Sequence, residues 1–294
     1  MSMDCRSTLI GSKAVEAMLM EAICAPAPGL VDRFNAGAHD DMDVFTFMKS
    51  TSALAPAMYA CSACGFSHEG MPRELLLKLR EIGVRGEVAM FQATAGVNTQ
   101  KGLLFIMGIL CAATGAVVKR GGFVTIEEIL NYVKEMCVGI VKAELDSVAD
   151  IYHDDISNEV VLTAGERLYV LYGLRGVRGE VEDGFPSVLF HALPAYEKAM
   201  EVGACEDDCL LHALLSLMSV VDDTTIVCRH GLNVLEEVKA NALRIMNCGG
   251  ALTKEGKQAI VALDESYSRR RISPGGSADL LAATYFLYEI TKSL

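Results

Sequence analysis

The segment 26–43 combines helix-breaking residues with a concentration of acidic side chains. Prolines and glycines keep most of it out of regular helix, and Asp40, Asp41 and Asp43 place three acids within four residues. Because like charges repel, such a cluster needs a reason. Asp41 and Asp43 could hold a hard cation such as Mg²⁺, which takes carboxylate oxygens. The alternative is a solvated acidic turn in which Asp43 caps the following helix.

Four further glycine-bounded polar loops separate apolar stretches. They cover residues 94–102, 172–186, 222–231 and 273–281. Glycines ahead of a helix N-terminus make an anion site, because free N–H groups and the helix dipole point outward. None of the loops matches the phosphate loop GxxxxGK[ST], and each alone could be an ordinary turn with a cap. Together they supply acids, cations and N–H groups, so we expect them to converge on one metal–polyphosphate pocket.

Composition excludes several classes of function. The chain has 294 residues and a net charge of -12, which argues against binding a nucleic-acid backbone. Tryptophan is absent and aromatic residues make up 6%, so base-stacking platforms are not expected either. Phosphorylated small molecules remain compatible, because they need only a few local cations or a metal.

The lack of a recognisable targeting signal and the spacing of the cysteines favour a cytoplasmic protein. The N-terminus lacks a basic region followed by an apolar run, and the longest apolar stretch, 103–118, is too short to span a membrane. We interpret it as a buried core helix. Cys61 and Cys64 form one CxxC motif, but no second cysteine pair follows to complete a zinc site. Cys205, Cys209 and His212 share one helical face, where they could form half of a metal site or, more simply, pack in the core. Reduced thiols fit best.

Hydrophobic periodicity predicts a mainly helical chain. Strand-like patterns are confined to the β-branched runs 158–163 and 224–228, and no domain boundary is evident. We therefore expect a single all-α domain covering residues 1–294, with its active site built from inter-helix loops. The expected helices are 8–24, 44–64, 72–83, 87–93, 103–118, one starting at 125, 136–149, 162–173, 187–202, 206–221, 232–246, 253–267 and 278–292.

Six motifs follow one another along about residues 20–290. They read PAPGLVDRFNAGAHDDMD, LREIGVRGEVAM, TAGVNTQKG, GVRGEVEDGFPSV, DTTIVCRHG and SPGGSADLLA. In this order they resemble the motifs of the triphosphoribosyl-dephospho-CoA synthases, which are accessory enzymes of citrate lyase and malonate decarboxylase.

The resemblance implies a helical, Mg²⁺-dependent pentosyltransferase. ATP would donate its triphosphoribosyl group to the ribose 2′-hydroxyl of 3′-dephospho-CoA, and adenine would leave. The product would be the precursor of the prosthetic group on the acyl carrier protein. The expected partners are ATP, 3′-dephospho-CoA and the transferase or acyl carrier protein of the lyase system, with no nucleic acid and no membrane.

Three tasks follow from a ribosyl cation-like transition state. Glu87 or Asp223 is expected to take the hydroxyl proton. His39 is expected to protonate the leaving adenine, unless it only holds the loop by a hydrogen bond. The expected metal ligands are Asp41, Asp43, Glu180 and Asp279. The expected ATP and phosphate ligands are Arg33, Asn98, Thr99, Lys101, Arg178, Arg229, Ser273, Gly275 and Gly276.

Two alternatives stay open, the first of them because of one departure from the family pattern. Relatives usually carry histidine at the position of Gln100, and glutamine cannot act as a general acid, although it can hydrogen-bond a phosphate or a base. The chain could therefore be a nucleotide-binding relative without turnover. It could also be a Mg²⁺-dependent hydrolase that gives the ribosyl group to water.

Overall fold

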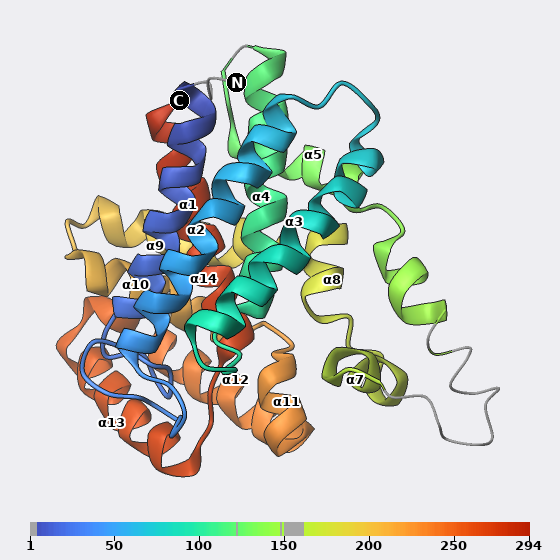
Figure 1. The fold of residues 1–294 in the computed structure, drawn as a ribbon. Coiled ribbons are helices and arrows are strands. Elements are labelled where there is room, and N and C mark those ends of the chain that lie inside the picture. The colour runs from blue at the N-terminus through green and yellow to red at the C-terminus, as the bar shows by residue number, and fades with distance from the viewer. Residues whose placement is uncertain (1–4, 122, 148, 150–161) are drawn as a thin grey trace, which may run out of the picture.

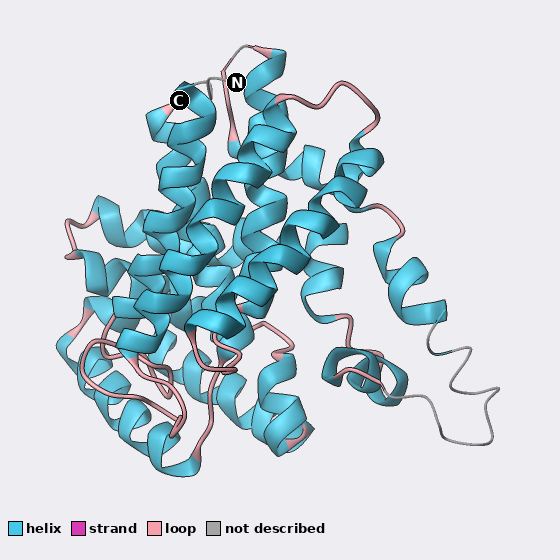
Figure 2. Cartoon of the chain, in the orientation of Figure 1, coloured by secondary structure: helices cyan, strands magenta, loops and turns pink. Residues whose placement is uncertain are grey.

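In a computed structural model, the chain folds entirely into helices and loops over the part that the structure describes, residues 5–121, 123–147, 149 and 162–294 (Figures 1 and 2). This confirms the all-α prediction. The helices are α1 (Cys5–Ile23), α2 (Val44–Phe66), α3 (Pro72–Ala93), α4 (Lys101–Arg120), α5 (Ile126–Cys137), η1 (Lys142–Asp146), α7 (Ala164–Tyr172), α8 (Gly176–Glu182), η2 (Val188–Ala192), α9 (Leu193–Glu201), α10 (Glu206–Met218), α11 (Thr224–His230), α12 (Leu232–Asn247), η3 (Gly250–Leu252), α13 (Lys254–Arg270) and α14 (Gly275–Ser293).

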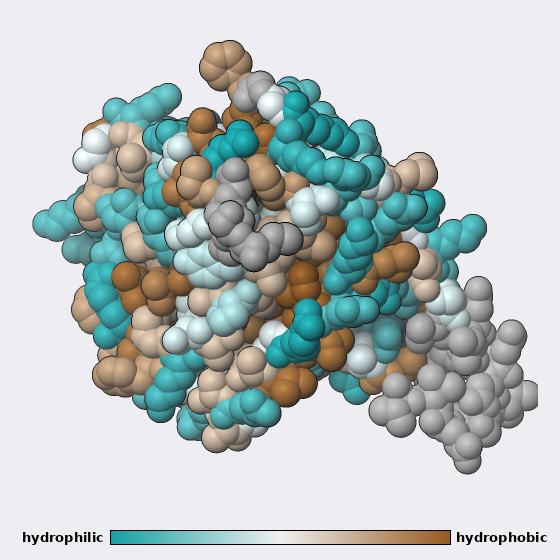
Figure 3. All heavy atoms as spheres, turned by 45° about the horizontal axis from the view of Figure 1, so that its top comes forward, coloured by the Kyte–Doolittle hydropathy of each residue, from teal (hydrophilic) through white to brown (hydrophobic). Residues whose placement is uncertain are grey.

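Helix α4 forms the centre of the core. Helices α1, α2, α3, α5 and α14 pack around it, and almost every residue from Leu103 to Val118 is buried (Figure 1). By length and composition α4 could cross a membrane, but 83% of its most apolar window is covered by the protein. The prediction of a buried core helix is therefore confirmed. The molecular face in Figure 3 is, by contrast, a mosaic of hydrophilic and hydrophobic residues.

Glycines allow α2 and α4 to approach closely. A Cβ atom added to Gly65 would lie 1.9 Å from the carbonyl oxygen of Ala112, and one added to Gly115 would lie 2.5 Å from that of Ser62. Both obstacles are backbone atoms, which cannot rotate away. The two helices can therefore pack this closely only because Gly65 and Gly115 lack side chains.

Helix α14 joins the α1–α5 group to the C-terminal helices. It contacts α1 and α4 on one side and α10, η2 and α11 on the other, while α10 packs against α9 and α12. Its first turn lies next to the first turn of α11 through contacts described below. The loops that start α4, α11 and α14 therefore meet at one end of the core.

The structure corrects three local predictions. Residues 224–228 are β-branched but form α11, because Asp223 caps their first turn. The loop expected at 172–186 contains α8, whose Val181 is fully buried. The two helices expected at 72–83 and 87–93 are the single helix α3, since Gly83 faces open space and does not interrupt it. Of the run 158–163, only 162 and 163 are among the described residues.

Two glycine substitutions should have opposite effects on stability. Gly65→Ala should destabilise the protein by about 1–3 kcal/mol, because the new methyl group meets backbone atoms. Gly83→Ala should stabilise it by about 0.5–1 kcal/mol, because alanine has less backbone entropy to lose in a helix and space is free. Denaturant unfolding of both variants checks this. Equal effects of the two would contradict the close α2–α4 contact.

Candidate active site

Polar side chains hold the loop between α1 and α2 in shape. The buried carboxylate of Asp32 accepts the backbone N–H groups of Ala27 at 3.0 Å and Asn35 at 2.9 Å. Asp264 of α13 accepts the N–H of Gly29 at 3.0 Å and the side-chain amide of Asn35 at 3.1 Å. Much of the polarity of this loop is therefore structural.

The acids of this loop that were expected to bind metal lie outside the cavity described next. Asp43 accepts the N–H of Thr46 at 2.9 Å and caps α2, which is the alternative that the sequence left open. Asp41 is largely exposed, 3.6 Å from Nδ1 of His39. Thr46, which also bonds the Asp43 backbone N–H, completes a capping box. A joint magnesium site on Asp41 and Asp43 gains no support from this arrangement.

The loops converge on a cavity of about 260 Å³, which we call the α4 cavity. It receives residues from α1, from the loop after α1, from the start of α4, from α11 and from the start of α14. The loops were expected to meet in one pocket, and most of the candidate residues do line this cavity. Its polar lining comprises Glu21, His39, Asn98, Thr99, Gln100, Lys101, Thr224, Thr225, Arg229, Ser273 and Asp279, with Gly102, Gly275 and Gly276.

Two cationic side chains, those of Lys101 and Arg229, line the α4 cavity. His39 also lines it, and its Nε2 is hydrogen-bonded to Oγ of Ser273 at 3.1 Å. Burial, followed by the nearby Arg229, lowers the pKa of His39 below its ordinary value. The imidazole is therefore neutral at physiological pH and suited to accept a proton.

The start of α4 presents unused hydrogen-bond donors to the cavity. Gln100 is 2% exposed, and its Oε1 accepts the hydroxyl of Thr51 at 3.2 Å. Its Nε2 has no hydrogen-bond partner within the described part of the chain. Asn98 accepts the N–H of Lys101 at 3.3 Å, and Gly102 follows in the first turn. An orphaned buried amide at a helix N-terminus is what a bound anion or base would satisfy.

Two carboxylates face the same cavity without a hydrogen-bond partner in the described chain. Burial raises the pKa of Glu21, on α1, to about 8. Burial, and then the charge of Glu21, raises the pKa of Asp279. A Cβ atom on Gly102 would lie 2.3 Å from Oδ2 of Asp279, so only glycine leaves that carboxylate its place. The sequence analysis missed Glu21, although it falls on the same helical stripe as the core residues Ile10 and Ala14.

Asp223 joins two helix N-termini below this cavity. Its buried carboxylate accepts the N–H of Thr225 at 3.0 Å and both the N–H and the hydroxyl of Ser277, at 2.9 and 3.2 Å. Burial raises its pKa, while these bonds and one from the N–H of Gly276 oppose the rise. The start of α14 was expected to bind a phosphate, but the carboxylate of Asp223 already accepts N–H groups there. Fewer N–H groups near Gly275 and Gly276 are therefore left for a phosphate.

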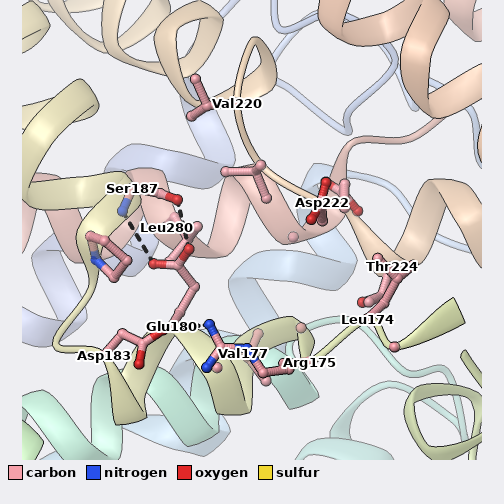
Figure 4. A pocket seen from close by; sticks show the side chains of 17 residues that line it. Leu174, Arg175, Val177, Glu180, Asp183, Ser187, Val220, Asp222, Thr224 and Leu280 are labelled. Carbon is pink, nitrogen blue, oxygen red and sulfur yellow. Dashed lines mark hydrogen bonds and ion pairs between the residues drawn. The ribbon is translucent and has the colours of Figure 1, made fainter. Parts of the chain in front are cut away.

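A second cavity of about 240 Å³, the α8 cavity, adjoins the first through shared lining residues Val177, Thr224 and Gly276. Figure 4 shows Glu180 and Ser187 on one side of it and Asp222 on another. Oγ of Ser187 donates to Glu180 at 2.6 Å. Burial raises the pKa of Glu180, and the Ser187 bonds partly offset this.

Besides Asp41, four other candidates line neither cavity. Arg33 forms a bidentate ion pair with Asp207, at 2.6 and 2.7 Å. Glu87 accepts from Nζ of Lys101 at 2.6 Å. Arg178 pairs with Glu144 at 2.7 Å. Asp43 was described above. Within the described residues no group of three or more His, Cys, Asp or Glu could hold a metal.

In the described part of this all-helical fold, two cations, the start of a helix and two carboxylates without hydrogen-bond partners surround one cavity, an arrangement that can accommodate a phosphorylated ligand. Residues 7–294 match the family model described as ATP:dephospho-CoA triphosphoribosyl transferase. The chain belongs to this family, and it is a transferase.

Curated relatives agree along nearly the whole chain. A probable 2-(5″-triphosphoribosyl)-3′-dephosphocoenzyme-A synthase of Vibrio cholerae is 41% identical over 97% of this chain and 88% of its own length. The synthase of Pectobacterium atrosepticum is 41% identical over 95% of this chain and 88% of its own length, and that of Klebsiella pneumoniae is 40% identical over 93% and 88%. No solved structure matches the chain.

Glu21 makes stability depend on pH. Its pKa is about 8 in the folded protein against an ordinary 4.5, so the folded state keeps a proton that the unfolded state loses between these values. Its contribution is complete below about pH 4.5 and is lost as the pH rises through about 8. Glu21→Gln should therefore stabilise the protein at pH 9, on the order of a few kcal/mol, and little at pH 4.5.

Denaturant unfolding at the two pH values measures this difference. Glu197→Gln, which removes an exposed carboxylate from α9, is the matched control and should show no such pH dependence. An equal effect of Glu21→Gln at both pH values would mean that folding does not raise the pKa of Glu21.

Proposed function

We propose that the chain transfers the triphosphoribosyl group of ATP to the ribose 2′-hydroxyl of 3′-dephospho-CoA. The observation that carries this is the orphaned Nε2 of Gln100 beside Lys101 and Arg229 in the α4 cavity, in a chain of this family. The bond between C1′ of the ATP ribose and N9 of adenine breaks, and a bond from C1′ to the acceptor oxygen forms. Adenine leaves with the electron pair of its bond and gains the proton that the hydroxyl loses.

The triphosphate binds at the start of α4 in this proposal. Lys101 and Arg229 supply positive charge, and the N–H groups that follow Lys101 in the first turn supply directed donors, whereas the N–H of Lys101 itself is bound by Asn98. The amide of Gln100 donates from its buried position. Glu87 acts through Lys101, because its ion pair holds the ammonium group in place. Arg33 and Arg178 drop out as phosphate ligands, since each is paired with a carboxylate elsewhere.

Magnesium fits the carboxylates that face this cavity. Glu21 and Asp279 supply oxygen atoms, lack hydrogen-bond partners within the described residues and line the same cavity. They would hold the ion, which neutralises triphosphate charge when bound. They take the place of Asp41 and Asp43 in our proposal, and Glu180 is assigned another role below.

Proton transfer falls to His39. It is neutral, lines the α4 cavity and is oriented by Ser273, so it can take the proton of the attacking hydroxyl and return it to the departing adenine. Asp223, the other expected base, is saturated with N–H donors. It positions Thr224 and the first turn of α14 instead.

The product would serve as the prosthetic-group precursor for an acyl carrier protein of a citrate lyase or malonate decarboxylase, in the cytoplasm. Two other functions differ from this one in what they do with ATP. A silent relative binds ATP without releasing adenine, and a hydrolase releases adenine without an acceptor.

Adenine release from ATP, followed by chromatography, distinguishes the three functions. We expect release that requires both 3′-dephospho-CoA and Mg²⁺, because the acceptor hydroxyl is the nucleophile and the triphosphate needs charge neutralisation. Release without acceptor would identify a hydrolase. Binding of ATP by calorimetry with no release under either condition would identify the silent relative.

The role of His39 predicts the acid limb of the pH profile. The base must be neutral, so kcat/KM should fall as the pH drops through the lowered pKa of His39, below the ordinary 6.5. His39→Gln should lower kcat about 10²–10⁴-fold and abolish that limb. His191→Gln, on the exposed side of η2, is the control. An unchanged acid limb in His39→Gln would remove His39 from proton transfer.

A further inference from the structure

The charged side chains that line the α8 cavity are mainly acidic. Glu180, Asp183 and Asp222 line it, and the guanidinium of Arg175 is already paired with Asp183. Asp222 is bound from outside by Lys239 at 2.5 Å. A ligand phosphate would thus meet carboxylates here, whereas hydroxyl and amino groups would find acceptors.

The local backbone holds Glu180 firmly toward this cavity. Ser187 donates to it through its hydroxyl at 2.6 Å and its N–H at 3.4 Å. Between them, Gly184 and the fully buried Phe185 both have left-handed backbones, with φ of 74° and 57°. For phenylalanine this conformation is strained, and such strain is concentrated at functional sites. A π-helix, η2, follows at once, and π-helical turns are frequent at such sites.

Apolar side chains also line this cavity. Leu174, Pro186 and Leu280 contribute to the lining, which suits the face of a nucleobase. The boundary with the α4 cavity consists of Val177, Thr224 and Gly276. A ribose placed at this boundary would have its hydroxyls toward both cavities.

We propose that the α8 cavity binds the adenosine end of the acceptor nucleotide and that Glu180 and Asp222 exclude coenzyme A by repelling its 3′-phosphate. The inference rests on the proposed function. The 2′- and 3′-oxygens are neighbours on one ribose. An acceptor whose 2′-hydroxyl is placed for attack therefore presents its 3′ position to Glu180 and Asp222. A 3′-hydroxyl donates a hydrogen bond to them, whereas a 3′-phosphate carries like charge.

The charge and the positioning of Glu180 can be separated by substitution. Glu180→Gln keeps the shape and removes the charge, so coenzyme A should bind at least tenfold more tightly than it binds the unmodified protein, while affinity for ATP stays within twofold. Asp222→Asn should act in the same direction. Ser187→Ala keeps the charge but frees the carboxylate, so affinity for 3′-dephospho-CoA should fall while coenzyme A stays excluded.

Isothermal calorimetry with 3′-dephospho-CoA, coenzyme A and a non-hydrolysable ATP analogue measures each affinity without turnover. Glu197→Gln on α9 is the charge-matched control and should leave all three affinities unchanged, and thermal unfolding verifies that each variant is folded. A folded Glu180→Gln that still rejects coenzyme A overturns the proposal, as does one that loses the ATP analogue instead. Because binding is read directly, a protein that discriminates as described but releases no adenine would refute the proposed function alone.

Discussion

The buried carboxylate of Asp223 is the interaction on which the site depends. Helices α11 and α14 start beside each other, and their first N–H groups would otherwise face one another unsatisfied in the interior. One carboxylate accepts from Thr225 of one helix and Ser277 of the other. Thr224, between the two cavities, is thereby held in place. Cavity shape, the start of α14 and the boundary between the cavities all follow from this single internal anion.

Much of the fold follows from hydrophobic periodicity, as the agreement of α1, α2, α4 and α14 with their expected ranges shows. Helices α8 and α11 were missed because each is short, glycine-rich or β-branched, and stabilised by tertiary contacts. Propensity alone cannot reveal such contacts. The helix cap at Asp43 could be named as the alternative to a metal site because capping is local, within three residues.

The site was predictable only where its chemistry is local. Lys101 at a helix start and His39 in its loop reach the expected cavity. Arg33 and Arg178 do not, because their partners Asp207 and Glu144 are distant in sequence, and a single sequence does not show which charges are already paired. Glu21 escaped notice for a related reason. A lone acid on an apolar helix face gains meaning only when the fold leaves it beside a second acid.

The contact between Gly102 and Asp279 ties together two positions 177 residues apart in the chain. A side chain at 102 would occupy the space of the carboxylate, and a longer acid at 279 would press on the backbone of α4. A larger residue at 102 therefore has to displace the carboxylate, whereas a shorter residue at 279 would leave room for it. The size of the side chain at one position thus limits the size that the other position tolerates.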